Sequence, residues 1–387
     1  MKVKKTQGIS ILINRKPLDF LFCRMKTILK SLTLETKMET IAFTWKNQIF
    51  SALDQRKLPH QEVWINCKNI TDVHAAIKDM VVRGAPLIGI TALYGLLISS
   101  IQNTQHDLSK LEKDVTFIKT ARPTAVNLAY EADRYLAFFK QNLGINDDWD
   151  KTLQLAEKFI VDVIQKLDQD NLKMAQFAEK ELATLYGDRK YKVVTLCNTG
   201  ALACGPRGTA FGVIDYLSQK GKIEHVFAAE TRPYLQGGRL TAYELKKAGI
   251  PYSVFVEGAM FHLFENNKID AVFIGADRIV SNGDTANKIG SATLSLVAKH
   301  FNVPFYVVAP TSSFDISLNI GSEIEIEYRP EEEVTSCQGV KIAPDSSRAY
   351  NPSFDVTPHQ QISAIFCENA MIKPVERVNV RNAVTGA

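Results

Sequence analysis

The sequence predicts an α/β protein in which a mostly helical N-terminal domain precedes a doubly wound, Rossmann-like domain built on a parallel sheet. Three observations support this fold class. The length of 387 residues fits two domains, and helical spacing of apolar residues dominates before Gly187. After Gly187, short apolar runs alternate with helical segments, as in α/β folds. We expect a basic appendage at 1–37, the helical domain at 38–187 and the Rossmann-like domain at 188–387.

Composition and charge indicate a packed protein without a general nucleic-acid-binding surface. The chain is 45% hydrophobic and 23% charged, which excludes disordered and low-complexity classes. Its formal charge of +4 is unevenly distributed, because residues 1–37 carry nine Lys or Arg against two acidic residues. The remaining chain carries 37 basic and 40 acidic residues and is therefore mildly acidic. We expect no nucleic-acid partner.

The cysteines indicate reduced thiols and a cytoplasmic location. Six Cys are scattered along the chain, with no Cys-x-x-Cys pair and no Cys/His cluster at metal-ligand spacing. We therefore expect no metal site. Arg15 and Arg24 interrupt the apolar residues near the N-terminus, so a secretory signal peptide is not expected.

One uncharged stretch, 84–106, is long enough to cross a bilayer by length alone. It contains three Gly and one Pro and ends in a run of Ser, Gln, Asn and Thr. These features favour a buried core helix over a membrane span. We expect no membrane association.

The N-terminal domain is expected to contain two short strands and several helices, identified by their apolar spacing and by capping residues. In order, the sequence predicts strands at 40–45 and 62–65, a helix capped by Thr71 or Asp72 and stopped by Gly84, the core helix that follows it, and three further helices with apolar faces at 126–139, 156–167 and 170–186.

The C-terminal domain is expected to alternate strands and helices. Because the strands are apolar on both sides, they predict a parallel sheet covered on both faces. The expected strands lie at 192–196, 226–229, 253–256, 271–274 and 304–308, and the expected helices at 208–219, 241–248, 258–266 and 288–301. Ligands of such sheets bind beyond the carboxyl ends of the strands, at the switch point of the strand order.

Two residues that follow predicted strands could carry chemistry. Asp277 is either a partner in a local ion pair with Arg278 or an acid or base whose pKa burial raises. Cys197 is either a small buried hydrophobe or a reactive thiol. His225 and His262 fall at other element boundaries, so a thiol-protease dyad is not expected.

Three further features have both a binding and a structural interpretation. The small-residue turn at 200–209 is either an anion site at a helix N-terminus or a tight turn, since it matches neither G-x-G-x-x-G nor Walker A. Glu230 stands where a nicotinamide-binding domain keeps its ribose-holding acid, but the glycine fingerprint is missing. Arg83 and Arg122, each beside a chain-turning residue, suit phosphate or carboxylate partners as well as surface salt bridges.

Taken together, several motifs resemble the methylthioribose-1-phosphate isomerase family of methionine salvage. The resemblance covers about residues 38 to 375. The segments that carry it are 80–86, 121–128, 197–203, 230–237, 275–279, 282–290 and 351–358.

The resemblance implies that an aldose 1-phosphate becomes a ketose 1-phosphate without a cofactor. Phosphate on the anomeric oxygen locks the sugar ring, so an acid must protonate the ring oxygen. By resemblance Asp277 is the proton donor, and Cys197 supports the transition state or handles the C2 hydrogen, which moves as a proton or a hydride. The family's substrate-binding positions match Arg83, Gly84, Ala85, Arg122, Gln236, Asn287 and Lys288. Lys288 falls at the start of a predicted helix, a position that suits an anionic ligand.

The sequence also departs from the family pattern. Leu196 stands where many members carry His, and Pro206 and Arg207 replace a Gly-Tyr pair; we expect Arg207 to face solvent. The same fold is shared by regulatory subunits of translation initiation factor two B and by ribose-1,5-bisphosphate isomerase. Cys197 and Asp277 are both present, which favours an enzyme. The resemblance implies a homodimer that binds a small sugar phosphate.

Overall fold

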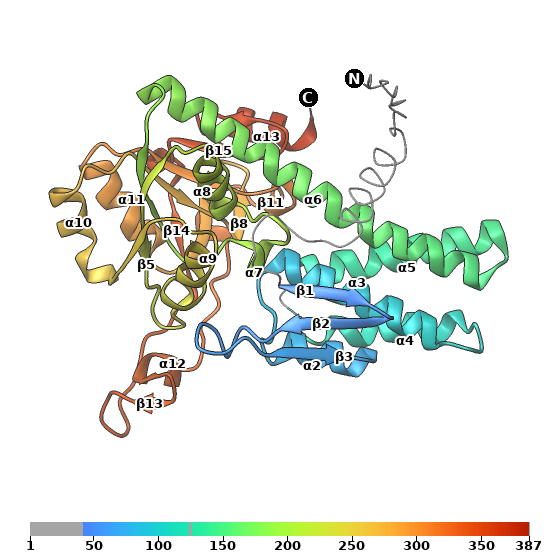
Figure 1. The fold of residues 1–387 in the computed structure, drawn as a ribbon. Coiled ribbons are helices and arrows are strands. Elements are labelled where there is room, and N and C mark those ends of the chain that lie inside the picture. The colour runs from blue at the N-terminus through green and yellow to red at the C-terminus, as the bar shows by residue number, and fades with distance from the viewer. Residues whose placement is uncertain (1–41, 124–125, 387) are drawn as a thin grey trace, which may run out of the picture.

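The structure is a computed structural model that describes residues 42–123 and 126–386. The predicted appendage at 1–37 lies outside these residues. The N-terminal part of the described chain contains a small sheet and a set of long helices (Figure 1). Its elements are β1 Phe43–Lys46, β2 Ile49–Leu53, β3 Trp64–Cys67, α2 Ile70–Lys78, α3 Ala85–Gln102, α4 Leu108–Lys119, α5 Val126–Asn146 and α6 Trp149–Tyr186.

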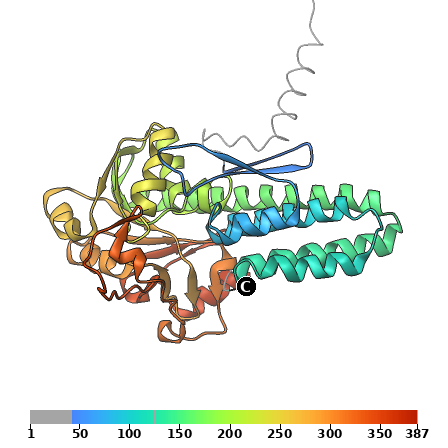
Figure 2. The ribbon, with the colours of Figure 1, turned by 90° about the horizontal axis from the view of Figure 1, so that it is seen from below.

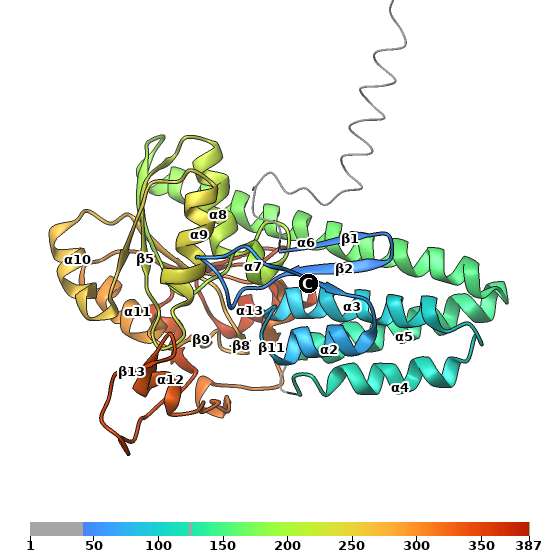
Figure 3. The same cartoon turned by 60° about the horizontal axis from the view of Figure 1, so that its bottom comes forward.

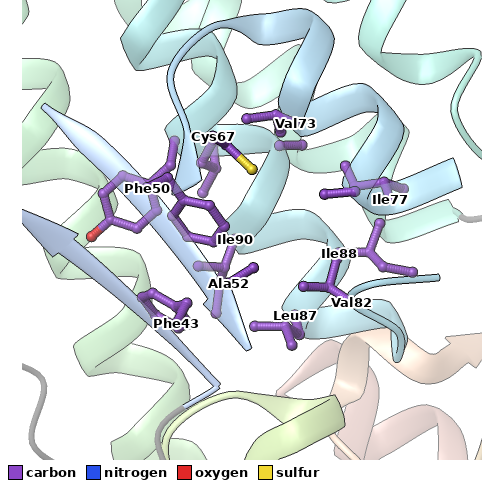
Figure 4. Close-up of a cluster of buried hydrophobic side chains, with 14 of the residues drawn as sticks. Phe43, Phe50, Ala52, Cys67, Val73, Ile77, Val82, Leu87, Ile88 and Ile90 are labelled. Atoms are coloured by element: carbon purple, nitrogen blue, oxygen red, sulfur yellow. The ribbon is translucent and has the colours of Figure 1, made fainter. Parts of the chain in front are cut away.

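The antiparallel sheet β1-β2-β3 packs its apolar face against α2 and α3. Phe50 is fully buried and its ring stacks on Phe43 at 5.5 Å and on Tyr94 of α3 at 5.3 Å. Figure 4 shows side chains from the sheet and from both helices meeting in this core. Among the described residues, α3 alone is long and apolar enough to cross a membrane, and 78% of it is buried inside the protein. This burial agrees with the predicted core helix.

Several N-terminal predictions need correction. Asn69, rather than Thr71 or Asp72, caps α2 by accepting a hydrogen bond from the backbone N–H of Asp72 at 2.8 Å. The helix ends at Lys78, and Gly84 instead precedes the next helix. The predicted helices at 156–167 and 170–186 are one continuous helix, α6. Neither β2 nor α4 was predicted from the sequence.

The helix α6 joins two hydrophobic cores. Its first half, from Trp149 to Ile164, packs with the N-terminal helices, whereas Met174 to Leu182 pack in a core with α8 and the large sheet. Figures 1 and 2 show it running along the molecule from the N-terminal helices to the sheet. The domain boundary at 187/188 stays a prediction.

The C-terminal part is a doubly wound α/β structure, which confirms the predicted fold class. Its seven-stranded sheet has the order β16-β15-β10-β7-β4-β5-β6, and all pairs are parallel except β15 with β16. The strands are β4 Tyr191–Thr195, β5 Ile223–Ala229, β6 Tyr252–Phe255, β7 Ala271–Ile274, β10 Phe305–Val308, β15 Ala364–Phe366 and β16 Met371–Ile372.

Helices cover both faces of this sheet. One face packs in a core with α6, α8 and α9, and the other face with α10, α11 and α13. The helical elements that follow α6 are α7 Ala201–Cys204, α8 Ala210–Gln219, the π-helix η1 Gly237–Thr241, α9 Ala242–Lys247, the 3₁₀ turn η2 Glu257–Ala259, α10 Met260–Asn266, α11 Ser291–His300, the 3₁₀ turns η3 Thr311–Ser313, η4 Gly321–Glu323 and η5 His359–Gln361, and the α-helices α12 Glu332–Thr335 and α13 Arg377–Thr385.

The strand order reverses between β4 and β7. From β4 the chain adds β5 and β6 on one side, and from β7 it adds β10 and β15 on the other. The loops that follow β4 and β7 therefore leave the same edge of the sheet in opposite directions, which creates the switch point where such folds bind ligands.

A second sheet, which the sequence analysis did not predict, stands next to this switch point. Its order is β11-β8-β9-β14, from β8 Arg278–Val280, β9 Thr285–Lys288, β11 Phe314–Asp315 and β14 Phe354–Thr357. The prediction of a helix at 288–301 was wrong at its start. Lys288 is the last residue of β9, and α11 begins at Ser291 after Gly290 with φ +100.

A projecting segment follows β11 and contains α12 Glu332–Thr335 with the hairpin β12 Ser336–Cys337 and β13 Val340–Lys341. It projects away from the sheet domain in Figures 1 and 3. Arg232 fastens it, because its Nη2 donates to the carbonyl oxygen of Val334 at 2.9 Å. This contact joins the segment to the chain after β5, close to the switch point.

Candidate active site

Cys197 follows β4 and has a strained backbone that neighbouring side chains hold in place. Its φ is +65, a left-handed conformation that costs a non-glycine residue about 1–3 kcal/mol. Its N–H donates to Thr231 Oγ1 at 2.9 Å, and its carbonyl oxygen accepts from Thr241 Oγ1 at 2.5 Å. Hydrogen bonds from the chain that follows β5 therefore fix the backbone that carries the thiol.

Asp277 follows β7, on the other side of the switch point. Its N–H donates to the carbonyl oxygen of Ala286 at 2.9 Å, which ties it to β9. Water reaches its side chain, although protein surrounds the carboxyl densely. Desolvation raises the pKa of Asp277, while the positive charges of Lys288 and Arg83 oppose that rise. Asp277 thus retains its proton to a higher pH than an ordinary aspartate.

The two candidate catalytic groups lie close enough to interact electrostatically. Burial raises the pKa of the Cys197 thiol, Arg83 and Lys288 lower it, and the negative charge of Asp277 raises it further. A thiol with a raised pKa is protonated at neutral pH. The structure therefore brings a neutral thiol and a proton-retaining carboxyl together at the carboxyl edge of the sheet.

Arg83 reaches this edge from the N-terminal part of the chain. It is buried, and its Nη2 donates to Asn198 Oδ1 and lies 3.5 Å from the Asn198 carbonyl oxygen. Its Nε is buried without a hydrogen-bond partner among the described residues. A buried guanidinium with an unused N–H can bind an anionic ligand.

Gly84 and Ala85 form the start of α3, against the turn that follows β4. Gly84 has φ +87, and a Cβ added there would lie 2.3 Å from the carbonyl oxygen of Ala203. Glycine is thus required by both backbone conformation and close approach. Ala85 is exposed and begins an 18-residue helix, whose second residue, Pro86, carries no N–H.

Two more cations face the same region without carboxylate partners. Arg122 forms no ion pair with any described residue; burial lowers its pKa, and Glu327 and Asp277 oppose that shift. Lys288 likewise forms no ion pair within the described chain, and its Nζ lies 4.5 Å from the centre of the Phe354 ring. Unpaired cations around Asp277 are suited to an anionic ligand.

The remaining predicted binding residues, Gln236 and Asn287, are buried amides on two different elements. Gln236 precedes the π-helix η1, and its Oε1 has no hydrogen-bond partner among the described residues. Asn287 lies on β9 next to Lys288, and its Nδ2 donates to Ser291 Oγ at 2.8 Å. The Asn287 amide therefore also holds the start of α11.

The structure adds residues that the sequence analysis did not assign to the site. Glu244 on α9 is fully buried, accepts a hydrogen bond from Asn198, and burial raises its pKa to about 7. Tyr234, Glu327 and Arg329 act electrostatically on Arg122. No local sequence pattern marks Glu244, because four consecutive residues of its short helix, Ala242 to Leu245, are buried.

The departures noted from the family pattern have structural roles. Arg207 does not face solvent as expected, because its Nη2 donates to Asp168 Oδ2 of α6 at 3.3 Å and its side chain is 18% exposed. It therefore ties the turn to α6 and is not available to a phosphate. Leu196 is fully buried in the core that includes α11.

The described residues contain no group of three or more His, Cys, Asp or Glu that could hold a metal ion. An open cavity of about 360 Å³ lies elsewhere, between β16 and α13, and none of the candidate site residues lines it. The chemistry-bearing side chains instead converge at the sheet's carboxyl edge.

Comparison with known proteins gives consistent matches. Residues 81–374 match the model of the initiation factor 2 subunit family. The chain is 42% identical to the methylthioribose-1-phosphate isomerase of Thermoanaerobacter sp. (strain X514) over 348 residues, 88% of this chain and 98% of the relative.

Two solved structures are similar over nearly their whole length. The 5-methylthioribose 1-phosphate isomerase of Pyrococcus horikoshii OT3 has a TM-score of 0.84 at 33% identity, covering 92% of this chain and 98% of that one. A protein of A. fulgidus described as translation initiation factor eIF-2B, subunit delta, has a TM-score of 0.80 at 34% identity, covering 90% and 100%.

Proposed function

The chain belongs to the initiation factor 2 subunit family and to the methylthioribose-1-phosphate isomerase family, and from this premise we propose its reaction. It converts S-methyl-5-thio-α-D-ribose 1-phosphate to S-methyl-5-thio-D-ribulose 1-phosphate, an aldose-ketose isomerisation in methionine salvage. The observation that carries this proposal is the meeting of Cys197 and Asp277 at the switch point, where the negative charge of Asp277 raises the pKa of the Cys197 thiol and both groups are acted on by Arg83 and Lys288.

Asp277 is the proposed general acid. The ring oxygen of the substrate must accept a proton as its bond to C1 breaks, and a carboxyl whose pKa is raised by desolvation keeps that proton to a higher pH than an ordinary aspartate does. Arg83 and Lys288 limit the rise in its pKa, so the same group can release the proton when the substrate binds.

Cys197 is proposed to support the transfer of hydrogen from C2 to C1. Its fixed, left-handed backbone sets the thiol against the substrate, and its raised pKa keeps the thiol neutral. A neutral thiol supplies a weak donor and an apolar sulfur surface. The proposed reaction needs no cofactor, because C1 is reduced as C2 is oxidised within one molecule.

The phosphate is proposed to bind the cations around Asp277. Arg83 and Arg122 offer guanidinium groups, and Lys288 offers an ammonium group. The helix start at Gly84 and Ala85 adds backbone N–H groups. Gln236 and Asn287 carry amides suited to the sugar hydroxyls.

We further propose that the protein acts as a homodimer in the cytoplasm and binds neither nucleic acid nor a membrane. The mildly acidic charge of the chain beyond residue 37 supports the absence of a polyanion partner. The homodimer is an expectation from the family resemblance, and the cytoplasmic location is the expectation from the scattered cysteines.

The test is turnover without added cofactor. Purified protein is mixed with methylthioribose 1-phosphate and, in a separate sample, with ribose 1,5-bisphosphate, and phosphorus NMR follows conversion. We expect conversion of the first compound to the ketose. Conversion of the bisphosphate alone would change the substrate assignment, and no conversion of either would favour a regulatory role like that of the initiation factor subunits.

The assigned roles are tested by Cys197→Ser. The serine variant keeps the backbone bonds to Thr231 and Thr241, so it should fold normally. We expect a loss of turnover of about a hundredfold or more. Unchanged turnover in a folded variant would remove Cys197 from the mechanism.

A further inference from the structure

Glu244 is a fully buried carboxyl that forms no direct ion pair with any described residue. Its Oε2 accepts a hydrogen bond from Asn198 Nδ2 at 2.5 Å, and its Oε1 accepts one from the backbone N–H of Leu202 at 3.2 Å. Gly200 leaves room for it, since a Cβ there would lie 2.3 Å from Glu244 Oε2. The turn that follows β4 therefore holds this carboxyl through hydrogen bonds and leaves space for it at Gly200.

The other face of the Asn198 amide meets Arg83. Arg83 Nη2 donates to Asn198 Oδ1, and an arginine side chain has no acceptor. The amide oxygen must therefore face Arg83 and the amide NH₂ must face Glu244. Glu244 accepts hydrogen bonds as a carboxylate, and one amide group separates its negative charge from the positive charge of Arg83.

The amide between Glu244 and Arg83 leaves the Nε N–H of the guanidinium without an acceptor among the described residues. A carboxylate in direct contact would occupy two N–H groups of the guanidinium at once. Arg83 is 7% exposed, and its Nε is buried without a partner among the described residues. Its charge still acts on Cys197 and on Asp277. The guanidinium is thus oriented and balanced in charge, yet able to donate to a ligand.

We propose that Glu244 is the counter-charge and positioning residue of Arg83, acting through Asn198, and that this arrangement keeps the Nε edge of Arg83 available to the substrate's phosphate. The inference rests on the proposed function, because it assumes a phosphate ester at this site. It assigns a role to a buried acid that does not touch the substrate.

Two variants test two features separately: the negative charge of Glu244, and the Asn198 amide that keeps a carboxylate out of contact with Arg83. Glu244→Gln removes the negative charge, so Arg83 is uncompensated until an anion binds. That variant should bind phosphate more tightly and be less stable without it. Asn198→Asp puts a carboxylate directly on Arg83 Nη2. The introduced carboxylate would share a proton with Glu244, so the net charge is unchanged while the guanidinium is occupied.

The experiment uses the full chain and inorganic phosphate, with affinity measured by isothermal titration calorimetry at pH 8. Burial raises the pKa of Glu244 to about 7, so the carboxyl is ionised there; the charged or titratable groups that act on it or respond to it are Arg83, Cys204 and Tyr243. The matched control is Glu265→Gln, an exposed residue of α10 that forms no ion pair within the described chain.

We expect Glu244→Gln to bind phosphate about fivefold more tightly and Asn198→Asp about tenfold more weakly, with Glu265→Gln unchanged. The gain for Glu244→Gln should shrink at pH 6, where the wild-type carboxyl is protonated. Weaker or unchanged binding by folded Glu244→Gln would overturn the proposal, and so would unchanged binding by Asn198→Asp. If Glu244→Gln does not fold, the phosphate affinity of Asn198→Asp tests the proposal instead.

The wild-type protein distinguishes a failure of this inference from a failure of the proposed function. If wild type binds phosphate and the variants behave as expected, but methylthioribose 1-phosphate is not converted, the proposed reaction is wrong and the role of Glu244 stands. If wild type converts the substrate and Glu244→Gln does not tighten phosphate binding, the inference alone is wrong. Wild type that does not bind phosphate would overturn the inference.

Discussion

Asp277 combines an accessible side chain with a dense protein environment, and this combination sets its chemistry. Its carboxyl is open to a ligand, but desolvation disfavours its ionised form. Nothing in the sequence around it distinguishes this state from a local ion pair with Arg278. In the structure Arg278 pairs instead with Asp315, at 3.3 Å between Nη1 and Oδ2.

Replacing Asp277 by Asn should abolish most of the activity while leaving the fold intact. Loss of a general acid typically lowers kcat by about a hundredfold to ten-thousandfold. We expect a fall of about a thousandfold in Asp277→Asn, measured by phosphorus NMR or a coupled assay. Asp162→Asn, an exposed residue on α6, serves as the control. Turnover of Asp277→Asn at the rate of the control would contradict the assignment.

The raised pKa of Asp277 also predicts how stability depends on pH. Its folded-state pKa lies above the ordinary value of 3.8, so ionisation of this carboxyl costs folding free energy as pH rises through the folded-state pKa. Asp277→Asn removes that cost. The Tm of the variant relative to wild type should therefore increase as pH rises from about 3.8 and then level off.

Melting curves of both proteins between pH 4 and pH 8, in a buffer without phosphate, provide the measurement. The Tm difference between Asp162→Asn and wild type should stay flat over the same range. A Tm difference for Asp277→Asn that falls with rising pH would mean that the folded protein stabilises the ionised carboxylate.

At the scale of elements, sequence patterns identified five of the seven strands of the large sheet, because these are apolar runs bounded by polar or turn residues, and missed β15 and the two-residue strand β16. Predicted strand 271–274 is observed as β7 Ala271–Ile274. The second sheet could not be predicted in this way. Its strand Thr285–Lys288 is short, lacks a β-branched run beyond its first residue and is stabilised by pairing with β8 and β14, which are distant or unrecognised in sequence.

The candidate site shows the same limit. Cys197 and Asp277 were predictable because they follow recognised strands, and their meeting follows from the strand order. The role of Asn198 between Arg83 and Glu244 depends on contacts across 115 and 46 residues of chain. No local pattern contains that information.

The close contact between α3 and the turn after β4 predicts a strong effect of Gly84→Ala. The new Cβ would meet the Ala203 carbonyl oxygen at 2.3 Å, in a backbone conformation with φ +87. We expect a loss of about 3 kcal/mol in unfolding free energy from overpacking and backbone strain together. Urea denaturation monitored by circular dichroism would measure it.

Gly144→Ala is the matched control for Gly84→Ala. Gly144 lies in α5, and a Cβ there would meet no atom within 4 Å. Alanine favours the helix over glycine by about 0.5–1 kcal/mol, so this variant should be as stable as wild type or slightly more so. Equal stabilities of the two variants would show that the turn adjusts around the added methyl group.

At the scale of the whole molecule, the shared helix α6 predicts where the chain can be divided. Its residues Met174, Ala178 and Leu182 are fully buried against the sheet domain. A fragment 188–387 lacks them and would expose an apolar face, whereas a fragment 168–387 retains them. We expect the longer fragment to be monodisperse by size-exclusion chromatography and the shorter one to aggregate. A folded, monodisperse 188–387 would show that α6 is dispensable to that core.

Removal of residues 1–37 tests the predicted appendage. These residues account for all of the excess positive charge, because the rest of the chain is net acidic, and none of the candidate site residues lies among them. We expect kcat and KM within about twofold of the full chain. A large rise in KM would indicate that the basic segment contributes to substrate binding.

The continuity of α6 restricts how the molecule can close over a ligand. The helix spans about 57 Å at 1.5 Å per residue over 38 residues, and it contains neither glycine nor proline. A hinge rotation between the N-terminal helices and the large sheet would have to break main-chain hydrogen bonds in its middle. We therefore expect any closure over a bound sugar to involve the projecting segment that contains α12, β12 and β13 rather than bending of α6, and spin labels on that segment should report the change when phosphate is added.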